Sequence, residues 1–223
     1  MKINADFSRR VVIRPADYRW VPSPMPGVER MMLDRIGEEV ARATSLVRYA
    51  PDSRFSRHVH GGGEEFFVLE GVFADEHAEY PRGTYVRNPI GTAHTPRVGP
   101  EGCTIFVKLH QFERDDTTPV VVDTTAAARD ASGDTGVETL ELHSFGSERV
   151  RLLRLAPGAE YRGLAGAGIA EMLVLEGTLT GRSDDCPAGT WIRDPGHGVE
   201  RIVAGTEGAL LFLKTGYPVP LDA

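Results

Sequence analysis

The segment HVHGGGEEFFVLEG, His58–Gly71, places titratable residues directly before an apolar run of strand length. Because side chains alternate between the two faces of a strand, His58 and His60 point to the same side. A neighbouring strand that begins at Glu64 can add a carboxylate to this pair of imidazoles. The segment therefore predicts a polar cluster at the mouth of a buried β-strand, and it leaves open whether Glu64 or Glu65 takes part.

Short strand-like runs of this kind occur along the whole chain. ATSLVRYA (43–50), GTYVRN (83–88) and CTIFVKLHQF (103–112) are rich in the β-branched and aromatic residues that suit a pleated surface. The 25 glycines and 15 prolines punctuate these runs. No long segment has a convincing helical period. Many short strands with frequent turns predict an all-β sandwich or barrel.

The chain also repeats itself at a shift of 106 residues, without insertions from Leu46 to Lys108. The paired segments are LVRYAP (46–51) with LLRLAP (152–157), EFFVLEG (65–71) with EMLVLEG (171–177), and PRGTYVRNP (81–89) with PAGTWIRDP (187–195). Farther upstream, GVERMMLDRIGEE and GVETLELHSFGSE match with a three-residue change of spacing. We expect two copies of one β-module, residues 1–115 and 136–223, joined by a linker or wrapping segment at 116–135.

A third imidazole completes the polar cluster of the first module. His94 follows a segment in which Gly83, Pro89 and Gly91 turn the chain sharply. Such turns can bring His94 inward, toward the pair formed by His58 and His60. Three neutral imidazoles and one carboxylate form a donor set suited to Zn²⁺, Fe²⁺, Ni²⁺ or Mn²⁺.

Two motifs in this region resemble those of the cupin superfamily. The first motif is a His-x-His, then a Glu three or four residues on, then a Gly, and the second runs from a Gly through Pro-x-Gly to a His. Their residues here are His58, His60, Glu64 and Gly71, then Gly83, Pro89, Gly91 and His94. HVHGGGEEFFVLEGVFADE and YPRGTYVRNPIGTAHTP resemble, more narrowly, the ChrR-like cupin family. The resemblance covers most of the chain and implies a bicupin, with two antiparallel jelly-roll barrels in one chain.

The repeat distinguishes the two glutamates. The counterparts of His58, His60, Glu64 and His94 are Leu164, Gly166, Ala170 and Glu200. Every expected ligand is thus replaced in the second module, whereas Glu65 recurs as Glu171. We therefore expect one metal site, formed by His58, His60, Glu64 and His94, and a second module without metal ligands. Glu65, on the opposite strand face, is expected to have a structural role shared by both modules.

Other polar residues have less support as site residues. His77, His110, His143 and His197 lie outside both motifs and are expected in ordinary loop or strand-end roles. Tyr85 and Arg87 share a strand face and are expected in packing or in a salt bridge. The glycines at 61–63 lack the lysine and helix of a phosphate loop, so we expect a tight turn that lets the backbone pass close to the metal.

Bulk composition limits the partners of the protein. A formal net charge of −7 and a pI near 5.5 disfavour binding to nucleic acid or to an anionic membrane. No apolar run reaches the length of a membrane span, and no signal peptide is visible. Cys103 and Cys186 have no framework spacing and are expected as reduced thiols, which favours a cytoplasmic location.

Function is then an expectation drawn from the resemblance. The family includes the zinc-binding cupin of ChrR-type anti-sigma factors and an iron-dependent acetylacetone dioxygenase. The resemblance implies a metal-dependent sensory or regulatory module in the transcriptional stress response, with Zn²⁺ first and Fe²⁺ or Ni²⁺ as alternatives. No His-x₃-Cys-x₂-Cys element precedes the cupin motifs, so sigma-factor binding is not expected.

Two further functions stay open at this point. One is a non-haem Fe(II) dioxygenase that cleaves small diketone-like substrates, and the other is a storage-like or structural bicupin whose metal stabilises the barrel. The sequence does not decide whether the protein is an enzyme and assigns no catalytic residue. Each of these functions is compatible with a small-molecule ligand and with either a monomeric or a homodimeric protein.

Overall fold

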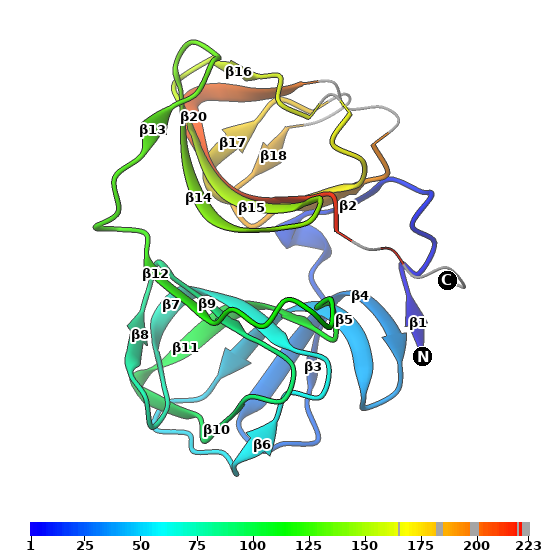
Figure 1. Cartoon of the computed structure of the whole chain (residues 1–223), viewed down its shortest axis with the longest axis vertical. Helices are drawn as coiled ribbons and strands as arrows, with labels where there is room; N and C mark the ends of the chain where they lie inside the picture. The colour runs from blue at the N-terminus through cyan, green and yellow to red at the C-terminus, as the bar shows by residue number, and fades with distance from the viewer. Residues whose placement is uncertain (165, 182–184, 197–200, 218, 220–223) are drawn as a thin grey trace. The chain divides into compact units, whose positions relative to one another are not determined.

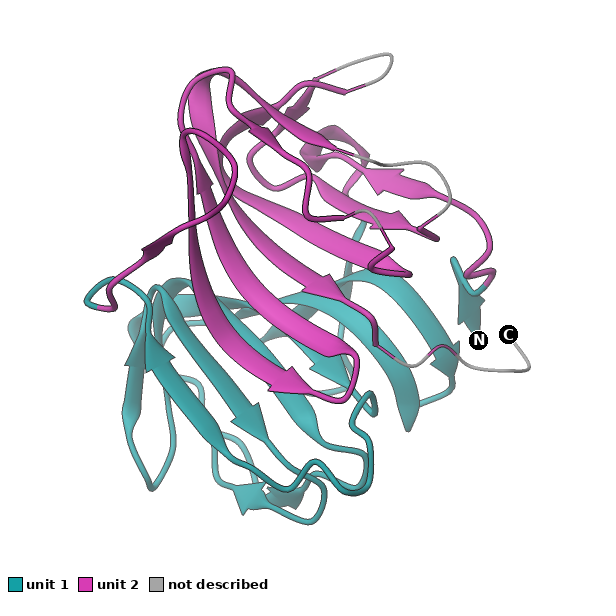
Figure 2. Cartoon of the chain, turned by 45° about the horizontal axis from the view of Figure 1, so that its top comes forward, with its two compact units in different colours: residues 1–5, 19–126 teal, residues 6–18, 127–223 magenta. Residues whose placement is uncertain are grey.

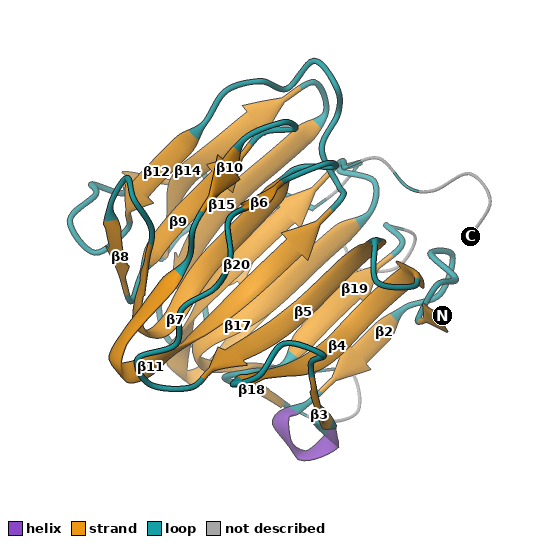
Figure 3. Ribbon diagram, turned by 90° about the horizontal axis from the view of Figure 1, so that it is seen from below, coloured by secondary structure: helices purple, strands orange, loops and turns teal. Residues whose placement is uncertain are grey.

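The computed structural model of the chain describes residues 1–164, 166–181, 185–196, 201–217 and 219. Strands dominate this part of the chain, and its one helical element is the 3₁₀ helix η1 (Pro15–Asp17) (Figure 3). No described helix is long and apolar enough to cross a membrane. The strands form two compact units, residues 1–5 with 19–126 and residues 6–18 with 127–223 (Figure 2). The all-β prediction is confirmed.

The first unit contains a 9-stranded antiparallel sheet and a separate 2-stranded sheet (Figure 1). The large sheet has the order β1-β4-β5-β11-β7-β9-β12, with β3 on β4 and β8 on β7, and the small sheet pairs β10 with β6. The strands are β1 (Lys2–Ile3), β3 (Trp20–Pro22), β4 (Val28–Gly37), β5 (Ala41–Tyr49), β6 (His58–Val59), β7 (Glu64–Ala74), β8 (Glu79–Pro81), β9 (Thr84–Asn88), β10 (Ala93–His94), β11 (Arg97–Leu109) and β12 (Val120–Asp123).

The alternation of strand β7 places the polar cluster at the interior of this unit. Phe66 and Val68 lie in the apolar core, where they pair in register with residues of β11. Glu64 precedes Phe66 by two residues, so its side chain faces the same interior. Glu65 and Phe67 face the other side of the sheet. A strand that is apolar inside therefore begins with a carboxylate directed inward.

The second unit repeats this arrangement. Its 9-stranded sheet has the order β13-β14-β15-β20-β17-β19-β2, with β16 on β20 and β18 on β17. The strands are β2 (Val11–Ile13), β13 (Asp130–Ala131), β14 (Val137–Phe145), β15 (Glu148–Leu155), β16 (Glu160–Tyr161), β17 (Ala170–Leu179), β18 (Cys186–Pro187), β19 (Trp191–Asp194) and β20 (Ile202–Thr215). The order β4-β5-β11-β7-β9 thus recurs as β14-β15-β20-β17-β19.

One glycine of each unit shows how closely the two backbones agree. Gly71 and Gly177 have φ values of +70° and +71°, which side chains rarely adopt. A Cβ atom added to Gly71 would lie 2.0 Å from the backbone oxygen of Gly102. One added to Gly177 would lie 2.1 Å from that of Gly208. Only glycine fits either position, so the repeat in the sequence is a repeat in backbone geometry.

Each unit is completed by a short strand that the sequence repeat assigns to the other module. VVI in β2 and VVV at the start of β12 occupy matching places upstream of the two GVE segments. Strand β2 nevertheless pairs with β19 of the second unit, and β12 pairs with β9 of the first. The segment 116–135, expected as a linker or wrapping segment, therefore supplies a sheet strand to the first unit. The compact units differ accordingly from a division of the chain at residue 115.

Candidate metal centre

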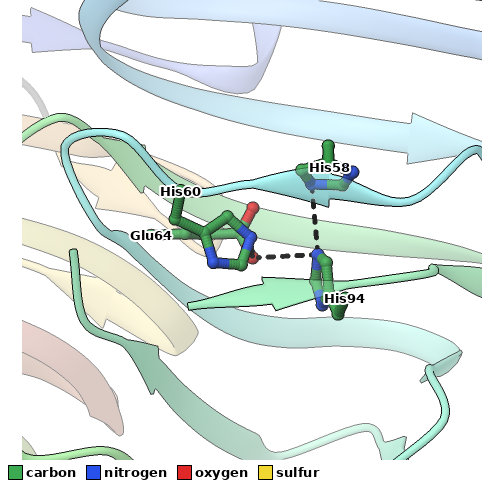
Figure 4. A group of neighbouring side chains, drawn as sticks. All are labelled: His58, His60, Glu64 and His94. Atoms are coloured by element: carbon green, nitrogen blue, oxygen red, sulfur yellow. Dashed lines mark hydrogen bonds and ion pairs between the residues drawn. The ribbon is translucent and has the colours of Figure 1, made fainter. Parts of the chain in front are cut away.

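Four side chains of the first unit converge on one point (Figure 4). His58 comes from β6, His60 follows that strand, Glu64 begins β7 and His94 comes from β10. One ligand atom of each lies within 4.8 Å of the others. His94 Nε2 is 3.2 Å from His58 Nε2 and 3.6 Å from Glu64 Oε1. His60 Nε2 is 3.5 Å from Glu64 Oε1. The structure therefore brings together all four residues that the sequence singles out.

The two-stranded ladder of β6 and β10 sets the positions of two of these imidazoles. His58 and His94 are direct antiparallel partners, so their side chains emerge side by side. The backbone N–H of His60 donates to Thr92 O at 2.8 Å, and the N–H of Gly91 donates to His60 O at 2.9 Å. These bonds hold His60 beside the turn that leads into His94.

The glycines at 61–63 have a different role from the expected one. The expected tight turn is present, since the N–H of Gly63 donates to His60 O at 3.4 Å. However, a Cβ atom added to Gly62 would lie 2.2 Å from His110 Nδ1, and one added to Gly63 would lie 2.3 Å from the ring of Phe112. Gly62 and Gly63 thus make room for the chain that follows β11, whereas Gly61 has only an ordinary contact with His110.

Each imidazole is anchored at Nδ1, the nitrogen remote from the cluster. The contacts are His60 Nδ1 to Thr92 Oγ1 at 2.9 Å, His94 Nδ1 to Asp75 Oδ2 at 3.2 Å, and His58 Nδ1 to the backbone oxygen of Ser56 at 3.3 Å. A hydrogen bond at one ring nitrogen fixes the tautomer and the ring orientation, and it leaves the other nitrogen available as a ligand. All three Nε2 atoms are those that face the centre.

Burial shows that the donor set fits a cation. His60, Glu64 and His94 are buried, whereas His58 is exposed. The Nε2 atom of His60 is buried and has no hydrogen-bond partner among the described residues. An unsatisfied buried nitrogen is costly, and a bound metal ion would provide its partner. Three imidazole nitrogens and one carboxylate oxygen suit a divalent transition metal.

The electrostatics of the cluster favour neutral side chains. Burial, together with the neighbouring His94 and His58, lowers the pKa of His60 to about 3. Burial also lowers the pKa of His94, and His58 adds to this effect. Burial raises the pKa of Glu64 to about 7, against the opposing hydrogen bond from Asn88. His60 is therefore already in the neutral form that a metal requires, the pKa of His94 is shifted in the same direction, and a cation would favour the ionised form of Glu64.

The second unit offers no such cluster at the described counterparts of these ligands. Leu164 and Ala170 are buried in its apolar core, 4% and 3% exposed. Gly166 has a φ of +71°, so the local backbone is also in a conformation that disfavours a side chain. Glu200, the counterpart of His94, lies outside the described residues, as does His197. Where the first unit has donor atoms, the described part of the second has hydrocarbon.

Glu65 has the structural surroundings that the repeat predicts. Its carboxylate forms a buried ion pair with Arg87, its register partner on β9. Arg87 also pairs with Asp116 and lies over the ring of Phe112, with its guanidinium carbon 4.1 Å from the centroid. The salt-bridge role expected for Arg87 is therefore confirmed. The second unit keeps the same register between Glu171 and Arg193.

The residues that hold the ligands were not found from the sequence. Asp75 lies outside both motifs, and Asn88 and Thr92 occupy unspecified positions within the second. Asn88 donates from Nδ2 to Glu64 Oε1 at 3.2 Å. One signal was available, because the 106-residue shift places Gly181 opposite Asp75 and Gly198 opposite Thr92. Asp75 and Thr92 are thus replaced in the second repeat together with the ligands that they contact.

Comparisons with known proteins agree with this architecture. The family described as ChrR Cupin-like domain matches residues 8–113 and again 117–218. No match was found among curated protein sequences.

Three solved structures illustrate the likeness in fold. A candidate dioxygenase from Nostoc punctiforme has a TM-score of 0.76 and 14% identity, and the match covers 94% of this chain and 83% of that one. A candidate glyoxylate-induced protein from Pseudomonas aeruginosa has a TM-score of 0.77 and 16% identity, over 100% and 93%. The pirin YhhW from Escherichia coli, in complex with nickel(II), has a TM-score of 0.68 and 13% identity, over 95% and 100%.

Proposed function

This chain belongs to the ChrR cupin-like family, and on that premise we propose that it is a bicupin whose first unit binds one divalent metal ion. The ligands are His58, His60, Glu64 and His94, and the second unit binds no metal. One observation carries the proposal: four donor atoms of the expected kinds lie within 4.8 Å of one another. A bound ion would supply Lewis acidity and exchangeable coordination positions at the point where these side chains meet.

The favoured role is a metal-dependent sensory or regulatory module. Four protein ligands can complete a tetrahedral shell, which is typical of zinc sites that do not perform chemistry. His58 is exposed, so the centre borders the surface and its state can be affected by small molecules in solution. We infer Zn²⁺ as the first candidate metal, since His and carboxylate ligands suit it and it needs no redox partner.

A second candidate is a non-haem Fe(II) dioxygenase, and the state of Glu64 favours it. The Oε1 atom that faces His60 and His94 also accepts the hydrogen bond from Asn88. With its pKa raised to about 7, Glu64 must release a proton in order to bind a metal near neutral pH, which reduces its net contribution as a ligand. Three imidazoles alone would leave positions of an octahedral ion open for substrate and dioxygen.

The aromatic interior supports this second candidate and indicates the class of substrate. The ring of Phe73 lies 5.9 Å from that of His94, and Tyr49 lies 5.7 Å from Phe73. Aromatic rings beside the cluster suit contact with a small, largely apolar molecule with a few oxygen atoms that can bind the metal. A diketone that forms an enolate has this chemistry. The likeness in fold to a candidate dioxygenase points in the same direction.

Two measurements separate these roles. Elemental analysis of protein purified without a nickel affinity step identifies the metal that is bound. Oxygen uptake is then measured for iron-loaded and zinc-loaded protein with a panel of small diketones. Turnover with iron that disappears in His94→Ala supports the dioxygenase, whereas no turnover across the panel supports the regulatory role. Protein that binds neither ion contradicts both.

A further inference from the structure

We propose that Asp75 is a positioning residue of the metal centre. Its carboxylate holds His94 in the tautomer with the proton on Nδ1 and the Nε2 lone pair toward the cluster, and Tyr80 holds Asp75 in place. This inference rests on the metal site proposed above. It adds a residue that touches no metal and that neither ligand motif contains.

The first step of the argument is the contact between Asp75 and His94. Asp75 Oδ2 lies 3.2 Å from His94 Nδ1, and both side chains are 3% exposed. An ionised carboxylate can only accept a hydrogen bond, so the proton of this contact belongs to His94 Nδ1. His94 Nε2 then carries a lone pair, and it is the atom that faces His58 and Glu64.

Asp75 is itself fixed by the hairpin that connects β7 and β8. Its Oδ1 atom accepts hydrogen bonds from the backbone N–H groups of His77 at 2.8 Å and Ala78 at 3.1 Å. The phenol of Tyr80 donates to the same carboxylate, with both oxygens 3.2 Å from its Oη. The backbone N–H groups and the phenol thus surround the carboxylate with donors and leave it as the acceptor toward His94 Nδ1. The carboxylate therefore has a defined position before any metal binds.

Asp75 gives His94 an anchor of a different kind from the other two. His60 is anchored by a hydroxyl group and His58 by a backbone carbonyl, both of which are neutral. A carboxylate partner raises the basicity of an imidazole ligand as well as orienting it. We therefore expect His94 to be the imidazole whose geometry and donor strength depend most on the residue behind it.

The second repeat shows that the hairpin does not need these side chains in order to form. The 106-residue shift places Gly181 opposite Asp75 and Cys186 opposite Tyr80. The strand pairing is nevertheless kept, since Leu179 pairs with Cys186 as Phe73 pairs with Tyr80. A purely structural role in the hairpin would apply to both units. At these two aligned positions, the carboxylate and the phenol occur only in the repeat that has the ligands.

The tautomer of His94 is the direct test, and it needs no metal. Nitrogen-15 NMR of the metal-free wild-type protein at about pH 8 should show the proton of His94 on Nδ1, with the signal assigned by comparison with His94→Gln. A proton on Nε2 would overturn the proposal. This measurement is decisive even if Asp75→Ala fails to fold, and it stands apart from the question of whether the protein binds metal.

Metal affinity provides the second test. Titration with Co²⁺, followed by absorption, should give an affinity for Asp75→Ala that is about 10- to 100-fold weaker than that of wild type. Asp75→Glu should recover part of this loss, and Tyr80→Phe should lose less than Asp75→Ala. Affinity of Asp75→Ala within twofold of wild type would overturn the proposal. Wild-type protein that does not bind Co²⁺ would instead refute the metal site, and the tautomer would still decide the role of Asp75.

Asp123→Asn is the matched control. Asp123 also caps a turn of the first unit, where its Oδ1 accepts from the N–H of Thr125 at 2.9 Å and from its hydroxyl at 2.6 Å. None of its contacts with the described residues involves one of the four ligands. Its substitution should leave the Co²⁺ affinity unchanged. An equal loss in Asp123→Asn and Asp75→Ala would show that any disturbed turn weakens the site, which would contradict a specific role for Asp75.

Discussion

The two units share a backbone plan and differ in what fills their interiors. The first places three imidazoles and a carboxylate beside an aromatic core, and the second places leucine and alanine at the matching points that the structure describes. Both units share the strand order and the register between Glu65 and Arg87 or Glu171 and Arg193. They also share the glycine within β7 or β17. The backbone plan is therefore kept in both units, whereas the cluster of His58, His60, Glu64 and His94 has no counterpart at the matching positions that the structure describes in the second.

This comparison separates structural from functional polar residues without any other sequence. Glu65 and Glu171 are both buried, and a buried carboxylate that persists in both units serves the sheet. Glu64 is also buried, but its counterpart is Ala170. Adjacent glutamates of one strand thus have opposite roles, because alternation directs one into the interior and the other to the opposite face.

The largest expected effect is a loss of metal affinity that occurs in one unit only. His60→Ala removes a buried ligand, and we expect the affinity for Zn²⁺ to fall about 100- to 1000-fold. This corresponds to about one quarter of a total binding free energy of about 10–16 kcal/mol, because the site has four ligands. Leu164→Ala, which changes a residue in the opposite unit, should leave this affinity unchanged. Competition titration with a chromophoric chelator measures both. Equal weakening by the two variants would contradict the assignment of metal binding to the first unit.

Leu164→Ala should instead destabilise the protein. Leu164 is 4% exposed in the core of the second unit, and deleting a buried leucine side chain typically costs about 2–5 kcal/mol. Chemical denaturation of the metal-free protein measures this loss. A Leu164→Ala protein as stable as wild type would show that the apolar filling of the second unit is not a packed core.

The next effect distinguishes the adjacent glutamates. Glu64→Gln should weaken metal binding about tenfold or more, since the neutral amide is a poor replacement for a carboxylate ligand. Glu65→Gln should keep the metal affinity and lower the free energy of unfolding of the metal-free protein by about 1–3 kcal/mol, because it removes a charge from a buried ion pair. The loss is limited because Arg87 keeps Asp116 as its other partner. Calorimetry of metal binding, with denaturation of the metal-free variants, gives both quantities. A larger loss of affinity in Glu65→Gln would reverse the roles assigned here.

The smallest effect concerns pH. Glu64 has a pKa of about 7 in the metal-free protein, so binding below that pH must release its proton. Metal affinity should therefore fall about tenfold per pH unit from pH 7 downward through this group. The pKa of His60, lowered by burial to about 3, keeps this imidazole neutral in the same range, and burial also lowers the pKa of His94. Glu64→Gln should reduce the pH slope by about one proton, and an unchanged slope would show that another group sets it.

The sequence predicted the fold and the four residues that cluster because both depend on local patterns. Strand alternation and turn glycines mark each element, and the 106-residue shift aligns them. His58, His60 and Glu64 lie within seven residues, so one strand and one turn suffice to place them near one another. His94 could be added because its preceding turns resemble those of a known family.

The parts that were missed depend on contacts that a local pattern does not specify. The exchange of β2 and β12 was not visible, since three apolar residues do not show which sheet edge they will join. Asp75 reaches His94 only because the hairpin after β7 folds back beside β10. The glycines at 61–63 were interpreted through the metal, whereas their close neighbours are residues after β11, about fifty positions later in the chain.

The number of metal ions bound per chain tests the central claim most directly. Protein is saturated with Zn²⁺, freed of weakly bound ions by gel filtration, and analysed for metal and for protein concentration. The account predicts one equivalent per chain, and none in a His58→Ala, His60→Ala variant that is still folded by circular dichroism. Two equivalents in the wild type, or a full equivalent in that variant, would contradict it.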